Sequence, residues 1–241
     1  MSIFKIKKLF FLSLFSLLMP VAAFGGNLVL KSFGHSSFLI KGDGQTILLN
    51  PYDTVGCASH LSKPWNLRFD FILASSRLAD EGYNPLNKLM FVDPGSYQFN
   101  ETIFNGIAVP HDRFEGRRYG MATVWVWEQN NLKIVHMGGS AGELNFNNKI
   151  LLASPDILFI SVGGGEKSYN GQEAAEIVNE LNPKIVIPVH YLGDKQNNPS
   201  CEFSNADEFL ANLSDYEVEY VAKRFTINPN KVDDKVIYII K

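Results

Sequence analysis

Apolar residues recur from residue 27 onward at every second position or in short unbroken runs, which is the pattern of β-strands. The first runs occupy residues 27–33, 36–42 and 45–51. Gly42, Asp43 and Gly44 join the second run to the third, and an Asp-Gly pair between apolar runs is typical of a tight β-hairpin. The sequence therefore predicts that the fold opens with short strands, of which these two form a hairpin.

The rest of the chain predicts more strands and few helices. Residues 171–183 (GQEAAEIVNELNP) place apolar residues on one helical face and end at Pro183, and residues 206–213 predict a second helix. Strands are predicted at residues 71–74, 89–92, 107–110, 122–128, 133–137, 157–161, 185–189 and 236–240. Many early strands, followed by strands that alternate with helices, indicate sheets covered by helices rather than an all-β sandwich.

The first 25 residues differ from the rest of the chain and predict a signal peptide. Basic residues at Lys5, Lys7 and Lys8 precede an apolar run at residues 9–19, and small residues follow Pro20. A membrane anchor is the alternative, but the run is shorter than the roughly 20 residues that a spanning helix needs. We expect an exported protein, periplasmic or secreted, with no stable membrane span once residues 1–25 are removed.

Removal of that segment would leave residues 26–241 as a single domain with an acidic balance. Without its three lysines, 19 Lys and Arg residues face 25 Asp and Glu residues, a formal net charge of −6. Nucleic acids and anionic membrane surfaces select basic patches, so neither is expected as a partner. The sequence leaves the oligomeric state open.

Two cysteines, Cys57 and Cys201, lie in loop-like stretches of the chain. An even number of cysteines in an exported protein is compatible with a disulfide. Two free or buried thiols are equally compatible with the sequence, and both interpretations stay open.

Four motifs occur together in a fixed order along the chain. They are GHSSFLI at residues 34–40, FILASSRLADEGYN at 71–84, VPHDRFEG through HMGGSAG at 109–142, and VIPVHYLGD at 186–194. In this order they resemble the metallo-β-lactamase superfamily, in particular its ascorbate-6-phosphate lactonase-like branch. The resemblance implies an α/β (α+β) fold, a four-layer αββα sandwich, and an ancestry among metal-dependent hydrolases.

The metal-binding motif that the resemblance implies is incomplete in this chain. The family pattern His-x-His-x-Asp-His corresponds to residues 76–81, SRLADE. Ser76, Leu78 and Glu81 stand where the family has histidines, and Asp80 alone is kept. A leucine cannot bind a metal, and a serine hydroxyl is a poor ligand for zinc.

The remaining ligand positions are mixed. The resemblance places His111 and His190 at two later histidine ligands, and it places Gly139 where the family has an aspartate that bridges two metals. His35 and His136 match supporting positions. The chain therefore lacks most of the ligands of a two-zinc site.

A residual set of Asp80, Glu81, His111 and His190 remains. As carboxylates and imidazoles, these residues suit one manganese, iron, magnesium or calcium ion better than zinc. The alternative is that Asp80 and Glu81 cap the turn and helix after the strand, where acids favour an N-terminus.

Three functions follow, and they differ in their need for metal. The leading hypothesis is a non-catalytic, metal-poor relative with a binding or structural role and no cofactor. Its rival is a hydrolase of an ester, lactone or phosphoester that holds a single divalent metal ion, with Asp80 as the base that orients the metal-bound water. The third is a metal-free module that binds a small molecule in the former active-site pocket.

Overall fold

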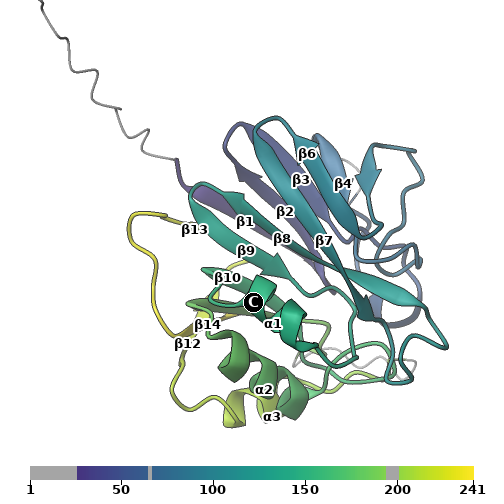
Figure 1. The fold of residues 1–241 in the computed structure, drawn as a ribbon, viewed down its shortest axis with the longest axis vertical. Coiled ribbons are helices and arrows are strands. Elements are labelled where there is room, and N and C mark those ends of the chain that lie inside the picture. The colour runs from purple at the N-terminus through teal and green to yellow at the C-terminus, as the bar shows by residue number, and fades with distance from the viewer. Residues whose placement is uncertain (1–25, 65–66, 194–200) are drawn as a thin grey trace, which may run out of the picture.

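Two β-sheets packed face to face form the body of the protein (Figure 1). The structure, a computed structural model, describes residues 26–64, 67–193 and 201–241. The predicted signal peptide at residues 1–25 lies outside the described residues. In the part that is described, no helix is both long and apolar enough to span a membrane.

The smaller sheet has six strands and begins with the predicted hairpin. Gly42 pairs with Gln45 across the turn, so the hairpin prediction is confirmed. The strand order is β13-β1-β2-β3-β4-β5, with β1 (Leu28–Gly34), β2 (Ser37–Gly42), β3 (Gln45–Leu49), β4 (Phe71–Leu73), β5 (Met90–Phe91) and β13 (Arg224–Ile227).

The larger sheet has eight strands, and its centre is parallel because β10 pairs in parallel with both β9 and β11. The strand order is β12-β14-β11-β10-β9-β8-β7-β6, with β6 (Gly95–Phe99), β7 (Thr102–Pro110), β8 (Met121–Gln129), β9 (Leu132–His136), β10 (Ile157–Ser161), β11 (Ile185–Val189), β12 (Glu217–Val221) and β14 (Val236–Ile240). Between the sheets lies the main apolar core, in which Phe38 meets Phe159 with ring centroids 4.9 Å apart.

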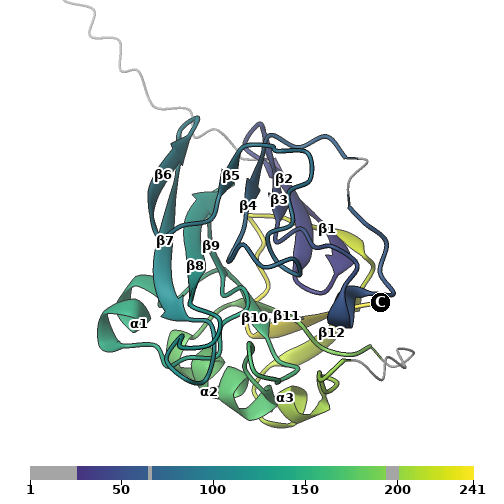
Figure 2. The ribbon, with the colours of Figure 1, turned by 90° about the vertical axis from the view of Figure 1, so that its right-hand side faces the viewer.

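Three helices cover the outer face of the larger sheet (Figure 2): α1 (Phe146–Leu152), α2 (Gly171–Leu181) and α3 (Asp207–Ala211). The predicted helix at residues 171–183 is confirmed as α2. Asn170 starts it with a capping box to Glu173, and Ala174, Val178 and Leu181 form its buried stripe.

Loops and one short 3₁₀ helix, η1 (Gly56–Ala58), lie in the chain between the strands of the smaller sheet. Partly buried Leu67 and Phe69 pack on the core cluster that contains Leu48 and Ile72. The predicted fold class is confirmed. On the outer face of the smaller sheet, however, the described residues include no α-helix, where the four-layer sandwich predicts one layer of helices. In the stretch between β3 and β4, Gly56 has a φ of 52°, a left-handed backbone that interrupts a right-handed helix, and Pro64 would end one.

Several elements differ from their predictions. Strand β7 begins at Thr102 rather than at residue 107, and the last helix is shorter than expected. Five elements were not predicted at all, namely η1, α1, β6, β12 and β13. Strand β12 (EVEYV) alternates glutamates with Val218 and Tyr220, but it is largely exposed at the edge of its sheet, so this short alternation does not mark a buried face.

Candidate functional site

Segments that follow four strand ends place polar residues at one edge of the sandwich. Ser75 follows β4, His111 follows β7, Gly139 follows β9, and His190 follows β11. Paired strands of the two sheets fix these positions, and the turns after them present the side chains. The three later motifs of the sequence thus meet in space.

Glu81 is the centre of this cluster. Its Oε2 atom accepts hydrogen bonds from Ser75 Oγ at 2.9 Å and Ser76 Oγ at 3.0 Å, and it lies 3.1 Å from His111 Nε2. Its other oxygen, Oε1, lies 3.8 Å from His190 Nε2. Glu81 is 1% exposed, so its carboxylate depends on these neighbours in place of water.

A tight turn brings Glu81 into this position. The backbone N–H groups of Glu81 and Gly82 both donate to the carbonyl of Leu78, and the hydroxyl of Ser76 accepts from the Leu78 N–H. No helix follows this turn. Of the alternative in which Asp80 and Glu81 cap a turn and a helix, the turn is therefore present and the helix is wrong.

Asn50 holds the strand end beneath the cluster. Its side chain donates to Ser75 Oγ at 2.8 Å and accepts from the Ser75 backbone N–H at 2.8 Å. Ser75 thus receives a hydrogen bond from Asn50 and gives its own hydroxyl hydrogen to Glu81. This polar chain orients the carboxylate.

The missing side chain at Gly139 makes room for Glu81. A Cβ atom built on Gly139 would lie 1.8 Å from Glu81 Oε1 and 2.8 Å from His111 Cε1. Real Cβ atoms do not approach other atoms so closely, so any larger residue here would displace the carboxylate. The Glu81 side chain occupies the space that an aspartate at position 139 would need.

Glu81 and His111 form a buried ion pair. Burial alone would raise the pKa of Glu81, but the charge and hydrogen bond of His111, with smaller effects of His190 and Lys167, hold it well below its usual value. Burial would lower the pKa of His111, but Glu81 outweighs it, and that pKa is raised. At neutral pH Glu81 is ionised, and its charge favours protonated His111.

The other buried histidines are neutral. Burial lowers the pKa of His35 and of His136 to about 4 each. Burial, with the neighbouring His35, holds the pKa of His190 well below its usual value. Among the described residues neither ring nitrogen of His190 has a hydrogen-bond partner.

Asp80 lies apart from this cluster and pairs with a lysine. Its carboxylate is 2.5 Å from Lys167 Nζ, which comes from the loop between β10 and α2. The charges of Asp80 and Glu81 raise the pKa of Lys167 against the opposing effect of burial. The sequence analysis missed Lys167, although it follows the run Gly163–Gly165 at a strand end, where functional loops are common.

The donor set does not fit a pair of metal ions. One predicted carboxylate, Asp80, is held by a lysine ammonium, and the other, Glu81, is held by two hydroxyls and His111. Leu78 and Gly139 supply no donor. Within the described ranges, no group of three or more His, Cys, Asp or Glu side chains is arranged to hold a metal ion.

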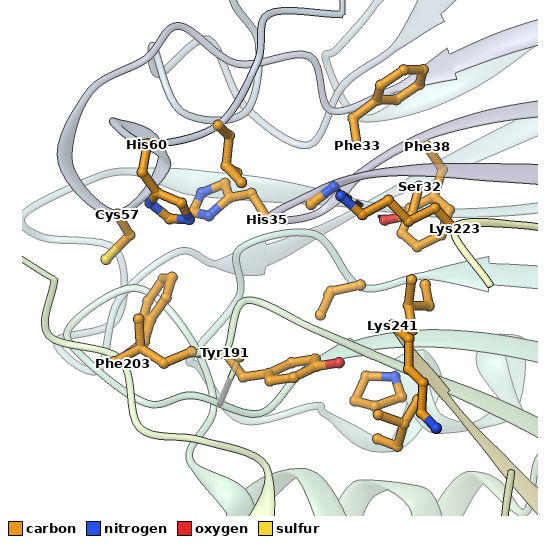
Figure 3. Close-up of a pocket in the computed structure, with 18 of the residues that line it drawn as sticks. Ser32, Phe33, His35, Phe38, Cys57, His60, Tyr191, Phe203, Lys223 and Lys241 are labelled. Atoms are coloured by element: carbon orange, nitrogen blue, oxygen red, sulfur yellow. Dashed lines mark hydrogen bonds between the residues drawn. The ribbon is translucent and has the colours of Figure 1, made fainter. Parts of the chain in front are cut away.

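A cavity of about 600 Å³ opens beside the cluster (Figure 3). The ring of His35 forms part of its wall and packs on His190, with centroids 4.0 Å apart. Phe203 stacks on the same His35 ring at 5.7 Å. The rings of His35 and Phe203, which both contact His190, therefore lie between the cavity and the ion-pair cluster.

A disulfide closes one side of this cavity. Cys57 and Cys201 are bonded, with Cα atoms 4.5 Å apart, and both line the cavity. The bond joins η1 to the segment that follows the His190 loop, 144 residues away in sequence. Of the two interpretations left open by the sequence, the disulfide is confirmed.

Comparison with known proteins identifies relatives over about two thirds of the chain. A model of the beta-lactamase superfamily domain matches residues 29–190. A UPF0173 protein of Pyrococcus abyssi is 27% identical over 180 residues, which are 66% of this chain and 81% of that protein. A UPF0173 metal-dependent hydrolase of Thermococcus onnurineus is 26% identical over 188 residues, 67% of this chain and 83% of that protein.

Solved structures show the same fold. A proposed zinc-dependent hydrolase of the metallo-beta-lactamase superfamily from Thermotoga maritima superposes with a TM-score of 0.69 at 23% identity, covering 88% of this chain and 98% of that one. A proposed metal-dependent hydrolase from Parabacteroides distasonis gives 0.60 at 14% identity, covering 79% and 94%. At these identities the likeness establishes the fold.

Proposed function

Because this chain belongs to the metallo-β-lactamase superfamily, we propose that it is a metal-independent member in which a buried ion pair has replaced the metal centre. In this proposal the protein binds a small molecule at the edge of the sandwich and does not hydrolyse it. The order of the four sequence motifs supports placing it in the ascorbate-6-phosphate lactonase-like branch.

The observation that carries the proposal is the position of the Glu81 carboxylate. It fills the space of a side chain at Gly139 and accepts hydrogen bonds from Ser75 and Ser76. A hydrolase of this superfamily needs a metal-bound water at this edge, and metal-bound water requires ligands that are free to coordinate. Here the candidate carboxylates already have partners inside the protein.

Lys167 supports the same conclusion at the neighbouring position. An ammonium group supplies positive charge beside Asp80 without any metal, and its raised pKa keeps that charge at neutral pH. The negative charges of Asp80 and Glu81 are thus balanced by residues of this chain.

We also propose that the protein is exported. The N-terminal pattern of basic, apolar and small residues supports this, and a disulfide is stable in an oxidising compartment. N-terminal sequencing of the protein from fractionated cells tests it. A mature protein that begins near residue 26 is expected, and an uncleaved cytosolic chain with free thiols would contradict export.

Metal analysis tests the proposed function. Protein purified without chelators or added zinc is expected to contain far less than one metal ion per chain by elemental mass spectrometry. Its melting temperature is expected to be the same with and without a chelator, because a bound metal would add stability. About two zinc ions per chain would overturn the proposal and restore a two-metal hydrolase.

The same analysis identifies the single-metal alternative. If one ion is found, His190→Ala should abolish its binding and His60→Ala, which changes an exposed residue, should not. Retention of the ion by both variants would place the metal elsewhere in the protein. Either way, a stoichiometric ion contradicts the proposed function.

A further inference from the structure

We propose that the cavity beside the cluster binds a small organic anion with an apolar body, such as a short fatty acid. In this proposal the ammonium group of Lys223 contacts the carboxylate of the ligand. This inference rests on the proposed function, since it names the class of small molecule. It concerns a cavity that the ion-pair cluster does not line directly. Its size of about 600 Å³ lies within the range of small-molecule sites.

The charge of the cavity selects an anion. Its lining includes Lys223 and Lys241, but among the described residues no aspartate or glutamate side chain. The whole chain, in contrast, has more acidic than basic residues. A concave surface with one sign of charge and apolar walls attracts the opposite charge more strongly than a flat one.

Lys223 is the cation best placed to meet a ligand. It lies in the turn between β12 and β13, and Figure 3 shows it extending along one wall toward His35, opposite Tyr191. Among the ion pairs of the described residues, none involves Lys223. Lys241 instead places its Nζ over the ring of Tyr220 at 4.3 Å.

The remaining walls suit an alkyl or aromatic body. Phe33, Phe38, Leu61, Val189 and Phe203 line the cavity from both sheets and from the loops beside them. Buried Phe38 and Val189 belong to the main core, which gives the cavity a rigid floor. The disulfide between Cys57 and Cys201 fixes the wall on the other side.

Matched probes of one chain length test this proposal. Calorimetric titration of the full mature protein with octanoate, 1-octanol and octylammonium compares a negative, a neutral and a positive head group on the same body. Octanoate is expected to bind about tenfold more tightly than 1-octanol, because its carboxylate makes a charge-assisted hydrogen bond with Lys223 that the hydroxyl group cannot make. Octylammonium is expected to bind more weakly than either.

Two variants separate the head group from the body. Lys223→Ala should weaken octanoate about tenfold and leave 1-octanol unchanged. Leu61→Ala should weaken both ligands. Lys88→Ala removes an exposed lysine outside the cavity and should change neither.

Equal affinities for octanoate and 1-octanol, or no effect of Lys223→Ala on octanoate, would overturn this inference. Absence of binding by all three probes would overturn it too. These outcomes are independent of the metal content of the protein. The metal analysis therefore tests the proposed function separately.

Discussion

At the scale of single residues, Glu81 and Gly139 act as a pair. The carboxylate at position 81 needs the absence of a side chain at position 139, because a Cβ there would lie 1.8 Å from Glu81 Oε1. Ser75, Ser76 and His111 then hold the carboxylate in place. In the correspondence that the resemblance implies, glutamate in place of a histidine and glycine in place of a bridging aspartate are therefore linked changes, because one needs the other.

Gly139→Ala tests this pairing. The added methyl group must displace Glu81 from its hydrogen bonds, so we expect a loss of about 1–3 kcal/mol in the free energy of unfolding by urea. Gly26→Ala is the control, because a Cβ at Gly26 meets nothing within 4 Å. Equal stability of the two variants would show that the Glu81 contacts carry no energetic weight.

Sequence reasoning found part of this site. The sequence predicted Asp80, Glu81, His111 and His190 as one set of metal ligands. The structure places Glu81 beside His111 and His190 but pairs Asp80 with Lys167, and metal binding by the set stays a prediction. The sequence could not show that hydroxyls of Ser75 and Ser76 would bind Glu81, since serine is common in loops. Nor could it bring Lys167 to Asp80, because 87 residues separate them.

Buried His136 predicts sensitivity to acid. Its pKa in the folded protein is lowered to about 4 by burial, below its ordinary value of 6.5 in an unfolded chain. The folded state therefore binds fewer protons than the unfolded state. As pH falls from about 6.5 to about 4, the free energy of unfolding decreases by about 1.4 kcal/mol for each pH unit. Over this window His136 alone accounts for about 3 kcal/mol.

Urea unfolding at several pH values measures this effect. His136→Phe should flatten the decline of unfolding free energy with falling pH, although His35 and His190, whose pKa values are also lowered, will keep part of it. His60→Ala, an exposed change, should leave the slope as it is. A slope that is unchanged in His136→Phe would show that His136 does not stay neutral in the folded protein.

At the scale of elements, burial separates the strands that could be predicted from those that could not. Strand β10 is buried at every residue and reads as a plain apolar run, as does β11. Helix α1 exposes Phe146, Ile150 and Leu151, so its apolar residues do not mark a buried face. The pattern of apolar residues reports burial, and elements with little burial leave a weak pattern.

The disulfide links η1 to the loop that contains Cys201, and its removal should lower the free energy of unfolding. Cys57 and Cys201 close a loop of 144 residues, for which the chain-entropy model gives a stabilisation of roughly 3–5 kcal/mol. Replacing both with serine should lower the free energy of unfolding by about this amount. Mass spectrometry after alkylation under denaturing conditions should find no reactive thiol in the unreduced protein, and two alkylated cysteines would contradict the bond.

At the scale of the whole molecule, the sandwich brings two different environments to one edge. The ends of β4, β7, β9 and β11 supply the ion-pair cluster, and the cavity lies beyond His35. The cluster is closed by internal partners, whereas the cavity is open to a ligand. This scaffold can therefore keep a binding function without its metal chemistry, since the strands that build the cavity do not depend on the ligands of a metal.

That independence can be tested by rebuilding the metal site. In the superfamily pattern the second metal takes Asp80, the residue at position 81, the bridging residue at position 139 and His190. Glu81→His together with Gly139→Asp restores this set, and removing the Glu81 carboxylate frees the space that the new aspartate needs. Adding Lys167→Met releases Asp80 from its ammonium partner.

The triple variant is expected to bind about one zinc ion per chain, because the new histidine at position 81, the new aspartate at position 139 and His190 then supply three ligands of suitable type. Asp80, freed from Lys167, can turn toward them as the fourth. Zinc at about one hundred times its dissociation constant should raise the free energy of unfolding by about 2.7 kcal/mol, whereas the unchanged protein should gain nothing. Gly139→Asp alone is the matched control: it adds a ligand but clashes with Glu81, so it should be destabilised and should not bind zinc. If Gly139→Asp alone binds zinc as well as the triple variant does, Glu81 and Lys167 do not exclude the metal. If the triple variant binds none, the loss of metal has a cause elsewhere in the fold.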